Sequence, residues 1–528
     1  MHMNILIVGA GPTGLVMAHE LARYGVSCRL IEKTSQRSLT SRAIGIHART
    51  LEVFELMGVV DDFLAAGHRI GAASAYSDRR RIARLALDTL ESRYPFILSL
   101  SQNETERLLE DHAGRRGVRV ERGTEIMALH QDENGVSVRL RSAGGRVEEE
   151  RMDWVVGCDG FHSTVRHLLD LSFKGGSYAD VVLLADIRVV GEIDPLEAQL
   201  FFAPNGLTAL LPMPEGRHRL VATEPPAEWG TEPTLEQCQS IMNSRGLGHL
   251  RLTDPIWTST FKIPHRSVAH FRKGRVFLAG DAAHVHSPIG AQGMNAGIQD
   301  AFNLAWKLGL AASEAAAPSL LETYEAERKP IDDAIIRWTD RGTRLLFLQG
   351  SAAHRVRTEV VSFLMQFAWL RRRIANAASQ LGVRYRHGPL VEEHSVSGGP
   401  RAGDRAPDAR IHGVASRTPH RFFELFARGR HTLLLLWPGG YDVPQLNLTA
   451  DLLAVYKIAA NGSTTADFTD VSGDVASRYG IEAAAYLVRP DGHVGFRCSL
   501  GETNNLLPDY LKKIFAKAGA SDSHIRAA

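Results

Sequence analysis

Residues 4–32, NILIVGAGPTGLVMAHELARYGVSCRLIE, decide the fold of the N-terminal part of the chain. The short apolar run from Asn4 to Val8 is typical of a strand buried on both faces, and Pro12 to Tyr24 carries apolar residues at helical spacing. A second β-rich run, 27–31, ends at Glu32. Strand, helix and strand within about 30 residues predict a βαβ unit.

A glycine motif lies between the first strand and the helix. Gly9 allows a tight turn, Gly11 lets the backbone approach a pyrophosphate, and Gly14 lets helix and strand pack closely. The helix N-terminus then offers N–H groups and a positive dipole end to phosphates, and Glu32 can accept bonds from a ribose. A purely structural glycine turn is the alternative. The candidate dinucleotide-binding residues are Gly9, Gly11, Pro12, Thr13, Gly14, Glu32 and Lys33.

A second motif, Gly280-Asp281-Ala282-Ala283-His284, follows an apolar strand at 275–279. The loop 287–295, SPIGAQGMN, then leads into a helix. An Asp at the end of a strand can bond the hydroxyls of a ribityl chain, and a glycine-rich loop before a helix can present N–H groups to an anionic flavin edge. A tight strand-to-helix turn with a capping loop is the alternative. A third motif, Gly157-Cys158-Asp159-Gly160, is followed by Ser163, Val165 and Arg166. Taken alone, it is explained equally well by a functional role and by a type I turn with a helix cap.

Together, GAGPTG with Glu32, CDGFHSTVR at 158–166 and GDAAHVHSPIGAQGMNAGIQDAFNLAWKL at 280–308 resemble the three motifs of the class A, p-hydroxybenzoate hydroxylase-like, FAD-dependent aromatic monooxygenases. The resemblance covers roughly residues 1–390. It departs from the expected pattern at Ala291, where a glycine would be usual.

The resemblance implies roles for individual residues around bound FAD. Arg42 and Gln102 would contact the diphosphate and ribityl region, and Gly280 with Asp281 the ribityl chain. Asp159 would help to place NAD(P)H, a transient co-substrate. Arg49, Glu52 and Glu106 match flavin-contacting and helix-anchoring positions. The residues that would line the isoalloxazine are Pro288, Gly293, Met294 and Asn295.

The resemblance also implies a reaction. NAD(P)H reduces FAD, O2 adds to give a C4a-hydroperoxyflavin, and its distal oxygen hydroxylates a phenolic or polycyclic aromatic substrate. His47 is a candidate base for the phenol, and a partly buried structural histidine is the alternative. Baeyer–Villiger-type oxygenation or another flavin oxidation of an aromatic polyketide or antibiotic is the second function considered, and a non-catalytic FAD-holding protein the third.

The predicted fold is α/β, with a Rossmann-like FAD-binding domain formed by 1–178 and 265–392. Alternating strands at 179–264 predict an inserted, mostly antiparallel β-sheet domain over the substrate. Arg188 or Arg219 could bind an acidic substrate, although both are expected to face solvent. Residues 400–528 resemble the thioredoxin-like C-terminal domain of larger phenol and polyketide hydroxylases, without a CxxC and therefore with a packing or dimerisation role. The candidate substrate-lining residues are Leu184, Phe201, Leu211 and Met213.

Composition limits the partners and the cellular compartment that can be expected for the protein. The chain has 528 residues and a net charge of +2, which gives no reason to expect a nucleic-acid or membrane partner. Its 4 cysteines show neither a CxxC nor metal-ligand spacing, which favours a reducing compartment. With no bilayer-length apolar run and no signal-peptide pattern at the N-terminus, the expectation is a cytoplasmic monomer or homodimer without a metal ion.

Overall fold

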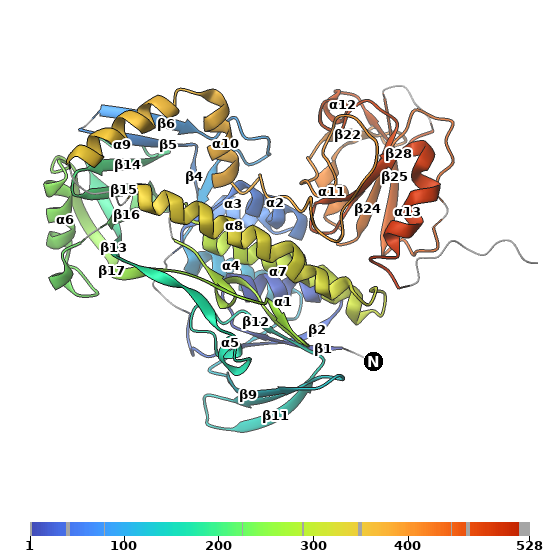
Figure 1. Ribbon diagram of the computed structural model, residues 1–528, viewed down its shortest axis with the longest axis horizontal. Helices are drawn as coiled ribbons and strands as arrows, with labels where there is room; N and C mark the ends of the chain where they lie inside the picture. The colour runs from blue at the N-terminus through green and yellow to red at the C-terminus, as the bar shows by residue number, and fades with distance from the viewer. Residues whose placement is uncertain are drawn as a thin grey trace, which may run out of the picture.

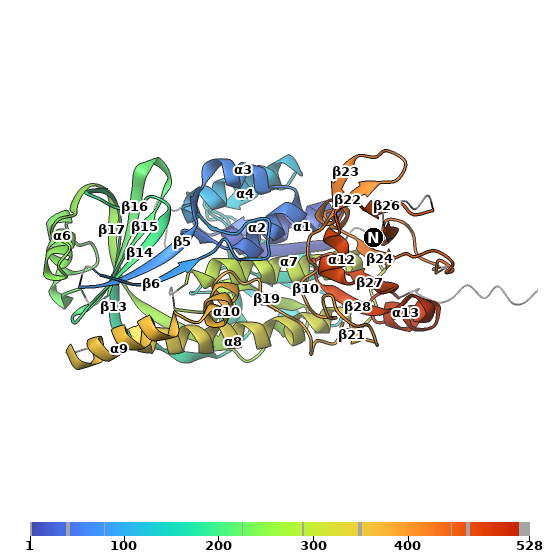
Figure 2. The same cartoon turned by 90° about the horizontal axis from the view of Figure 1, so that it is seen from above.

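The computed structural model describes residues 3–37, 43–78, 80–223, 225–287, 290–346, 351–444, 446–460 and 465–516. Within them, three large sheets lie along the molecule: a central sheet beneath long helices, a second sheet at one end, and a C-terminal sheet at the other (Figures 1 and 2). No helix in the described ranges is both long enough and apolar enough to cross a bilayer.

The central sheet has the strand order β18-β19-β12-β1-β2-β8. Its middle strand β1 (Asn4–Val8) pairs in parallel with β2 (Ser27–Glu32) and with β12 (Trp154–Gly157), and α1 (Pro12–Arg23) connects β1 to β2. The predicted βαβ unit is therefore confirmed. The other strands are β8 (Val120–Arg122), β18 (Arg272–Lys273) and β19 (Val276–Leu278).

Helices cover this sheet. α1 packs on α7 (Gln292–Ala312), which is buried along almost its whole length, and α7 packs on α8 (Thr323–Leu346). α4 (Gln102–Arg115) also contacts α1. Residues 48–66 form two helices, α2 (Ala48–Met57) and α3 (Val60–Ala66), because Gly58 adopts a left-handed φ of 79° and ends the first.

The second sheet has the order β20-β17-β13-β16-β15-β14-β5-β6. Its neighbouring strands pair antiparallel, except that β14 and β5 run parallel. Two of its strands come from residues 72–86, so the sheet extends beyond the segment expected to form it. The strands are β5 (Ala72–Ser77), β6 (Arg80–Ala86), β13 (Phe173–Val190), β14 (Glu197–Ala203), β15 (Gly206–Pro212), β16 (Arg217–Thr223), β17 (Arg251–Val268) and β20 (His284–Val285).

Helices flank both faces of this second sheet. α6 (Leu235–Ser244) packs its buried side chains against Leu183, Leu210 and Leu220 on one face. α9 (Ser351–Leu364) and α10 (Ala368–Ala378) contact the β6 edge (Figure 1). α9 ends at Leu364 and α10 begins at Ala368, so these are two separate helices.

The C-terminal sheet has the order β21-β28-β27-β24-β25-β26-β22-β23. β24, β25 and β26 are parallel to one another, and β27 runs antiparallel to both β24 and β28. The strands are β21 (Glu392–Glu393), β22 (Arg410–Gly413), β23 (Pro419–Arg421), β24 (His431–Leu436), β25 (Leu453–Ala460), β26 (Phe468–Asp470), β27 (Ala484–Val488) and β28 (Val494–Ser499). The helices are α11 (Phe422–Phe426), α12 (Asp474–Tyr479) and α13 (Thr503–Leu511).

Two smaller sheets complete the described fold. The first joins the segment before α2 to the segment before α4. The second is an antiparallel meander formed by residues 125–152. Their strands are β3 (Gly45–Ile46), β4 (His68–Ile70), β7 (Ile97–Ser99), β9 (Glu125–Gln131), β10 (Val136–Arg141) and β11 (Val147–Met152), and a short helix, α5 (Thr164–Leu168), follows β12.

Candidate functional site

The glycine loop has the geometry of a pyrophosphate cradle. Gly9 has a φ of +103°, and a Cβ on it would lie 2.4 Å from the Cys158 carbonyl oxygen. A Cβ on Gly14 would lie 1.9 Å from the Gly9 carbonyl oxygen, so strand and helix approach as closely as only glycine allows. By contrast, a Cβ on Gly11 would meet no atom of the described residues within 4 Å. The open space at Gly11, in front of the α1 N-terminus, fits a dinucleotide phosphate.

Glu32 supports this loop directly. Its Oε2 accepts a 2.9 Å hydrogen bond from the Ala10 N–H, and its Oε1 accepts bonds from the N–H and hydroxyl of Thr34. Lys33, the next residue, is 72% exposed and pairs with Glu125 at 3.5 Å. The carboxylate therefore shapes the glycine loop, and the predicted ribose and cofactor contacts of Glu32 and Lys33 stay predictions.

Gln102 and Arg42 were both expected near the diphosphate. Gln102 is the first residue of α4, and its Nε2 donates a 2.8 Å hydrogen bond to Oε1 of Glu106. Burial raises the pKa of Glu106, although the bond from Gln102 opposes it. Arg42 lies outside the described residues.

The Gly280-Asp281 motif meets the glycine loop at Thr13. A Cβ on Gly280 would lie 2.6 Å from the Thr13 hydroxyl oxygen, and one on Gly297 of α7 would lie 2.4 Å from the same atom. Asp281 is exposed at this junction, and the first turn of α7 begins beside it, because a Cβ on Gly293 would lie 3.8 Å from Asp281 Oδ1. The structure therefore brings together the N-termini of α1 and α7, as binding of one FAD molecule requires.

Asn295 links the start of α7 to the segment that precedes α2. Its Oδ1 accepts a 2.9 Å hydrogen bond from the His47 N–H, and its Nδ2 donates to the carbonyls of Gly45 and Ala291 at 2.8 and 2.7 Å. The buried amide thus clamps segment 45–47 to the start of α7, and the predicted contact of Asn295 with an isoalloxazine stays a prediction. Met294 is half-buried beside it, and Pro288 lies outside the described residues.

His47 completes this clamp. Its Nε2 donates to the carbonyls of Gly290 and Ala291, at 2.8 and 3.1 Å, while Nδ1 is buried without a partner among the described residues. Burial lowers the pKa of His47 to about 4, although these two bonds oppose it. The ring is therefore neutral near pH 7 and positions the loop. The role of His47 as a base stays a prediction. Only Nδ1 could accept a proton, because Nε2 donates to the two carbonyls.

Asp159 caps a helix. Its Oδ1 accepts a 2.6 Å bond from the Ser163 hydroxyl, and its Oδ2 accepts a 3.1 Å bond from the Val165 N–H. Arg166, from the same motif, donates a 3.0 Å bond to the Ala282 carbonyl. The third motif is thus a cap that also braces the Gly280-Asp281 turn, and a contact of Asp159 with NAD(P)H is untested.

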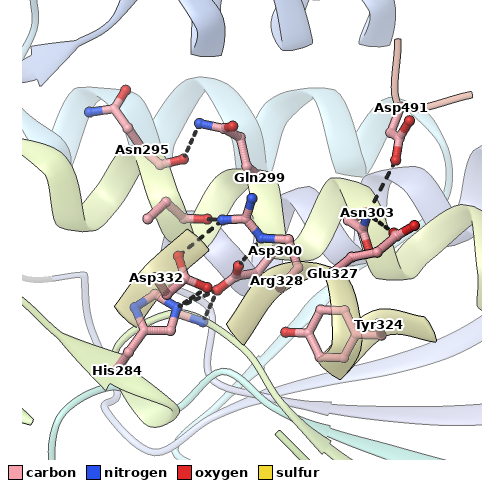
Figure 3. A network of polar contacts seen from close by, with 12 residues as sticks. His284, Asn295, Gln299, Asp300, Asn303, Tyr324, Glu327, Arg328, Asp332 and Asp491 are labelled. Atoms are coloured by element: carbon pink, nitrogen blue, oxygen red, sulfur yellow. Dashed lines mark hydrogen bonds and ion pairs between the residues drawn. The ribbon is translucent and has the colours of Figure 1, made fainter. Parts of the chain in front are cut away.

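A buried charge network lies beneath the second motif (Figure 3). Asp300 of α7 accepts bonds from the Gly280 N–H at 3.0 Å, from His284 Nε2 at 2.6 Å and from Arg328 Nε at 2.6 Å. Arg328 also donates to Asp332 at 3.1 Å, and His284 Nδ1 lies 3.0 Å from His286 Nε2. The network, all of it buried, fixes the backbone of the turn that carries Asp281.

The charges of this network follow from its contacts. Burial opposes a charge on His284, but the carboxylates of Asp332 and Asp300 outweigh it and raise the pKa to about 9. Burial, opposed by Arg328, raises the pKa of Asp332 to about 7. Burial would also raise the pKa of Asp300, but His284 and Arg328 outweigh it and hold that pKa below its usual value. His284 is therefore charged at neutral pH, and its Nδ1–H donates to His286.

We expect this charge to make stability depend on pH. His284 has a pKa of about 9 in the folded protein against 6.5 as its ordinary value. The contribution of His284 to stability is complete below pH 6.5 and is lost as the pH rises through 9, and it amounts to about 3 kcal/mol. Urea unfolding of the wild type and of His284→Gln should show a stability difference that shrinks over this range. A difference independent of pH would mean that His284 is neutral.

Ala291 stands where a glycine was expected, and its backbone conformation is strained. It occupies the cap position before α7 with φ 53° and ψ 40°, the left-handed region. Ala291→Gly should therefore raise the free energy of unfolding by about 0.5–1 kcal/mol, the strain relieved less the added entropy of the unfolded chain. Gly290→Ala is the matched control, because Gly290 has φ +77° and the change should destabilise. Urea unfolding measures both, and a destabilised Ala291→Gly variant would contradict the strain.

The residues expected to line the substrate lie on both faces of the second sheet. Leu184 packs with Val182 on the face opposite α6, and strand pairing places Leu211 on that face through Arg219 and Asp186. Phe201 instead packs with the α6 core. Met213 is buried just after β15. The four residues therefore do not form one continuous wall.

Arg219 does not face solvent as expected. It is buried on the same face as Leu184, is ion-paired with Asp186, and lies 4.9 Å from the centre of the Trp257 ring. Trp257 Nε1 donates to Asp186 at 2.9 Å. Arg188 is half-buried, and its side chain, 44% exposed, pairs with Asp254 at 3.1 Å. Arg219 can be buried because Asp186, which lies directly opposite it in the β13–β16 pair, neutralises its charge.

The network under the second motif was not foreseen from the sequence. Asp300, Lys307, Glu327, Arg328 and Asp332 are all buried, and the first two lie on α7, a helix that is buried along almost its whole length. Charged residues inside such a helix are the available signal, because buried charges require partners. Arg49 and Glu52, which match flavin-contacting and helix-anchoring positions, pair with each other within α2.

A parallel sheet with a pyrophosphate loop, joined to a second helix N-terminus that can face an isoalloxazine, defines an FAD-binding α/β flavoprotein. Comparison with protein families agrees with this class and makes it more specific. Residues 2–339 match the family described as "FAD binding domain", and residues 399–518 match the family described as "Aromatic-ring hydroxylase, C-terminal". The chain belongs to the class A FAD-dependent aromatic monooxygenases.

Individual proteins show the same similarity over most of the chain. Pentachlorophenol 4-monooxygenase of Sphingobium chlorophenolicum is 33% identical over 94% of each chain. The 6-methylpretetramide 4-monooxygenase of Streptomyces rimosus is 36% identical over 74% of this chain and 71% of that protein. The structure of OxyS, the anhydrotetracycline hydroxylase of Streptomyces rimosus, has a TM-score of 0.79 and 30% identity, covering 98% of this chain and 99% of its own.

Proposed function

We propose that this FAD-dependent monooxygenase uses NAD(P)H and O2 to hydroxylate a phenolic or polycyclic aromatic compound. The observation that carries the proposal is the junction at Thr13, where the pyrophosphate loop, the Gly280-Asp281 turn and the start of α7 meet. The relatives support the substrate class, since their names give a chlorinated phenol, 6-methylpretetramide and anhydrotetracycline.

The chain's own residues provide binding and orientation. Bound FAD supplies the redox chemistry, by accepting a hydride from NAD(P)H and activating O2. Gly11 and the α1 N-terminus would hold the pyrophosphate, and Asp281 the ribityl hydroxyls. Gly293, in the first turn of α7, places a positive helix end where it would stabilise a reduced, anionic flavin. The Asn295–His47 clamp keeps that helix end in place.

The face of the second sheet opposite α6 is the proposed substrate wall. Leu184 and Leu211 supply apolar surface there, and Phe201 is dropped from the wall because it packs toward α6. The positive charge of Arg219 is neutralised by Asp186. A wall with no net charge from this pair favours a neutral aromatic ring system over a carboxylate substrate.

The proposed domain division follows the three large sheets. The FAD-binding domain comprises 1–178 and 265–392 without the strands at 72–86, which join residues 179–264 in the substrate domain. Residues 400–528 form a thioredoxin-like domain, a proposal supported by the parallel pairing of β24 with β25 beside the antiparallel pair β27 and β28. The sequence contains no CxxC there, so its role is structural.

The test is NAD(P)H oxidation by the FAD-loaded protein with a panel of phenols and aromatic polyketides. We expect substrate-stimulated turnover and a product heavier by one oxygen atom, with NMR showing a new ring hydroxyl. Insertion of oxygen next to a carbonyl would indicate Baeyer–Villiger chemistry instead. Stimulation that gives only hydrogen peroxide would identify an effector, and no response across the panel would contradict the proposal.

A further inference from the structure

We propose that the C-terminal domain is part of the flavin site's framework: the turn between β27 and β28 positions the helices that carry the flavin-facing loops, with Arg489 as the positioning residue. This inference concerns how FAD is held and goes beyond the reaction proposed above. The domain itself supplies no residue to the three FAD motifs, which all lie before residue 310.

The turn bonds to three helices of the FAD-binding part at once. Arg489 donates to both carboxylate oxygens of Glu327 on α8, at 2.5 and 2.9 Å. The Asp491 carboxylate accepts a 3.2 Å bond from Asn303 of α7, and its carbonyl accepts a 2.7 Å bond from Arg49 of α2. Figure 3 shows Asp491 reaching Asn303 beside Glu327. The loops of the clamp described above immediately precede α2 and α7.

Electrostatic balance in this interface depends on both domains. Lys307 of α7 donates to Glu327 at 2.8 Å, and Arg489 bonds both Glu327 and Asp491. The two cations and two anions are all buried, and together they carry no net charge. Loss of Arg489 alone would leave one uncompensated buried negative charge, which is strongly unfavourable.

The interface connects to the flavin-side network through adjacent residues of α8. Glu327 bonds Arg489, and the next residue, Arg328, bonds Asp300, which holds the Gly280 N–H. Tyr385 gives a second link, because its hydroxyl accepts a 3.3 Å bond from Arg328 while Arg489 lies 5.1 Å from the centre of its ring. A shift of α8 at Glu327 therefore moves the support of the Asp281 turn.

Full-length variants test this role through FAD binding, which is independent of monooxygenase turnover. Arg489→Met should weaken FAD binding to the apoprotein at least tenfold and change the visible circular dichroism of the flavin bound at saturation. Arg497→Met is the matched control. Arg497 is in the same domain and similarly buried, 3% exposed against 1%, but it bonds Glu393 and the carbonyls of residues 396, 398 and 400. It should lower the melting temperature and leave the FAD dissociation constant within twofold.

A double variant separates positioning from simple charge imbalance. Arg489→Met with Asp491→Asn restores neutrality but not the bond to Glu327, so stability should recover while FAD binding stays weak. Recovery of both would overturn the proposal, as would equal FAD affinity of Arg489→Met and the wild type. If Arg489→Met does not fold, Arg489→Lys keeps the charge with a single donor group and should weaken FAD binding several-fold. A wild type that does not bind FAD would instead refute the proposed function.

Discussion

Gly11→Ala should give a protein that folds with wild-type stability and does not retain FAD. The backbone at Gly11 has φ −74° and ψ −178°, which any residue adopts, and a methyl group there would meet no described atom. The same methyl would occupy the space where the pyrophosphate must approach the backbone. We expect FAD affinity to fall on the order of 10- to 100-fold, the usual cost of overpacking.

Gly14→Ala is the matched comparison for this effect. Its methyl would lie 1.9 Å from the Gly9 carbonyl oxygen, a backbone atom that cannot move aside cheaply. This variant should lose stability with or without FAD. Flavin-fluorescence titration and thermal unfolding of both apoproteins separate the two causes. Unchanged FAD affinity in Gly11→Ala would place the dinucleotide elsewhere.

The glycine loop could be predicted from sequence because its requirements are local. Gly9, Gly11 and Gly14 are fixed by a turn, a close approach and a helix–strand contact, all within one βαβ unit. Gly280 and Asp281 were recognisable for the same reason, since they follow a buried strand directly. These residues, together with the motif at 158–166, carry the resemblance that indicated the class of protein.

Contacts made across long stretches of sequence could not be predicted in this way. Asn295 has the right position for a flavin contact, but its partners are 248 and 250 residues away, at His47 and Gly45. The burial of Arg219 depends on Asp186, which faces it only because β13 and β16 pair in one register. Such pairs require the register of a sheet or the packing of helices, which motif spacing does not contain.

Arg328→Met should cost the protein about 3–5 kcal/mol of unfolding free energy, the loss expected when one partner of a buried ion pair is removed. Arg328 donates to Asp300 at 2.6 Å and to Asp332 at 3.1 Å, and all three side chains are inaccessible to solvent. Without it, His284 alone faces two buried carboxyl groups. Asp300 would then hold the Gly280 N–H less firmly, so FAD affinity should fall as well.

Two companion variants show whether burial is the cause. Arg139 pairs with Glu149 on the surface, where both side chains are more than half exposed, and Arg139→Met should cost less than about 1 kcal/mol. Arg328→Met combined with Asp332→Asn removes one uncompensated carboxyl group, so it should recover part of the lost unfolding free energy. Asp332 has a pKa of about 7, so its neutral form costs little at neutral pH. Urea unfolding at pH 7.5 measures all of them. The loss of stability in Arg328→Met could instead be no larger than that in Arg139→Met. Asp332 would then be protonated, and the charge on Arg328 would contribute little to stability. In that case His284 and Asp300 alone would hold the Gly280-Asp281 turn.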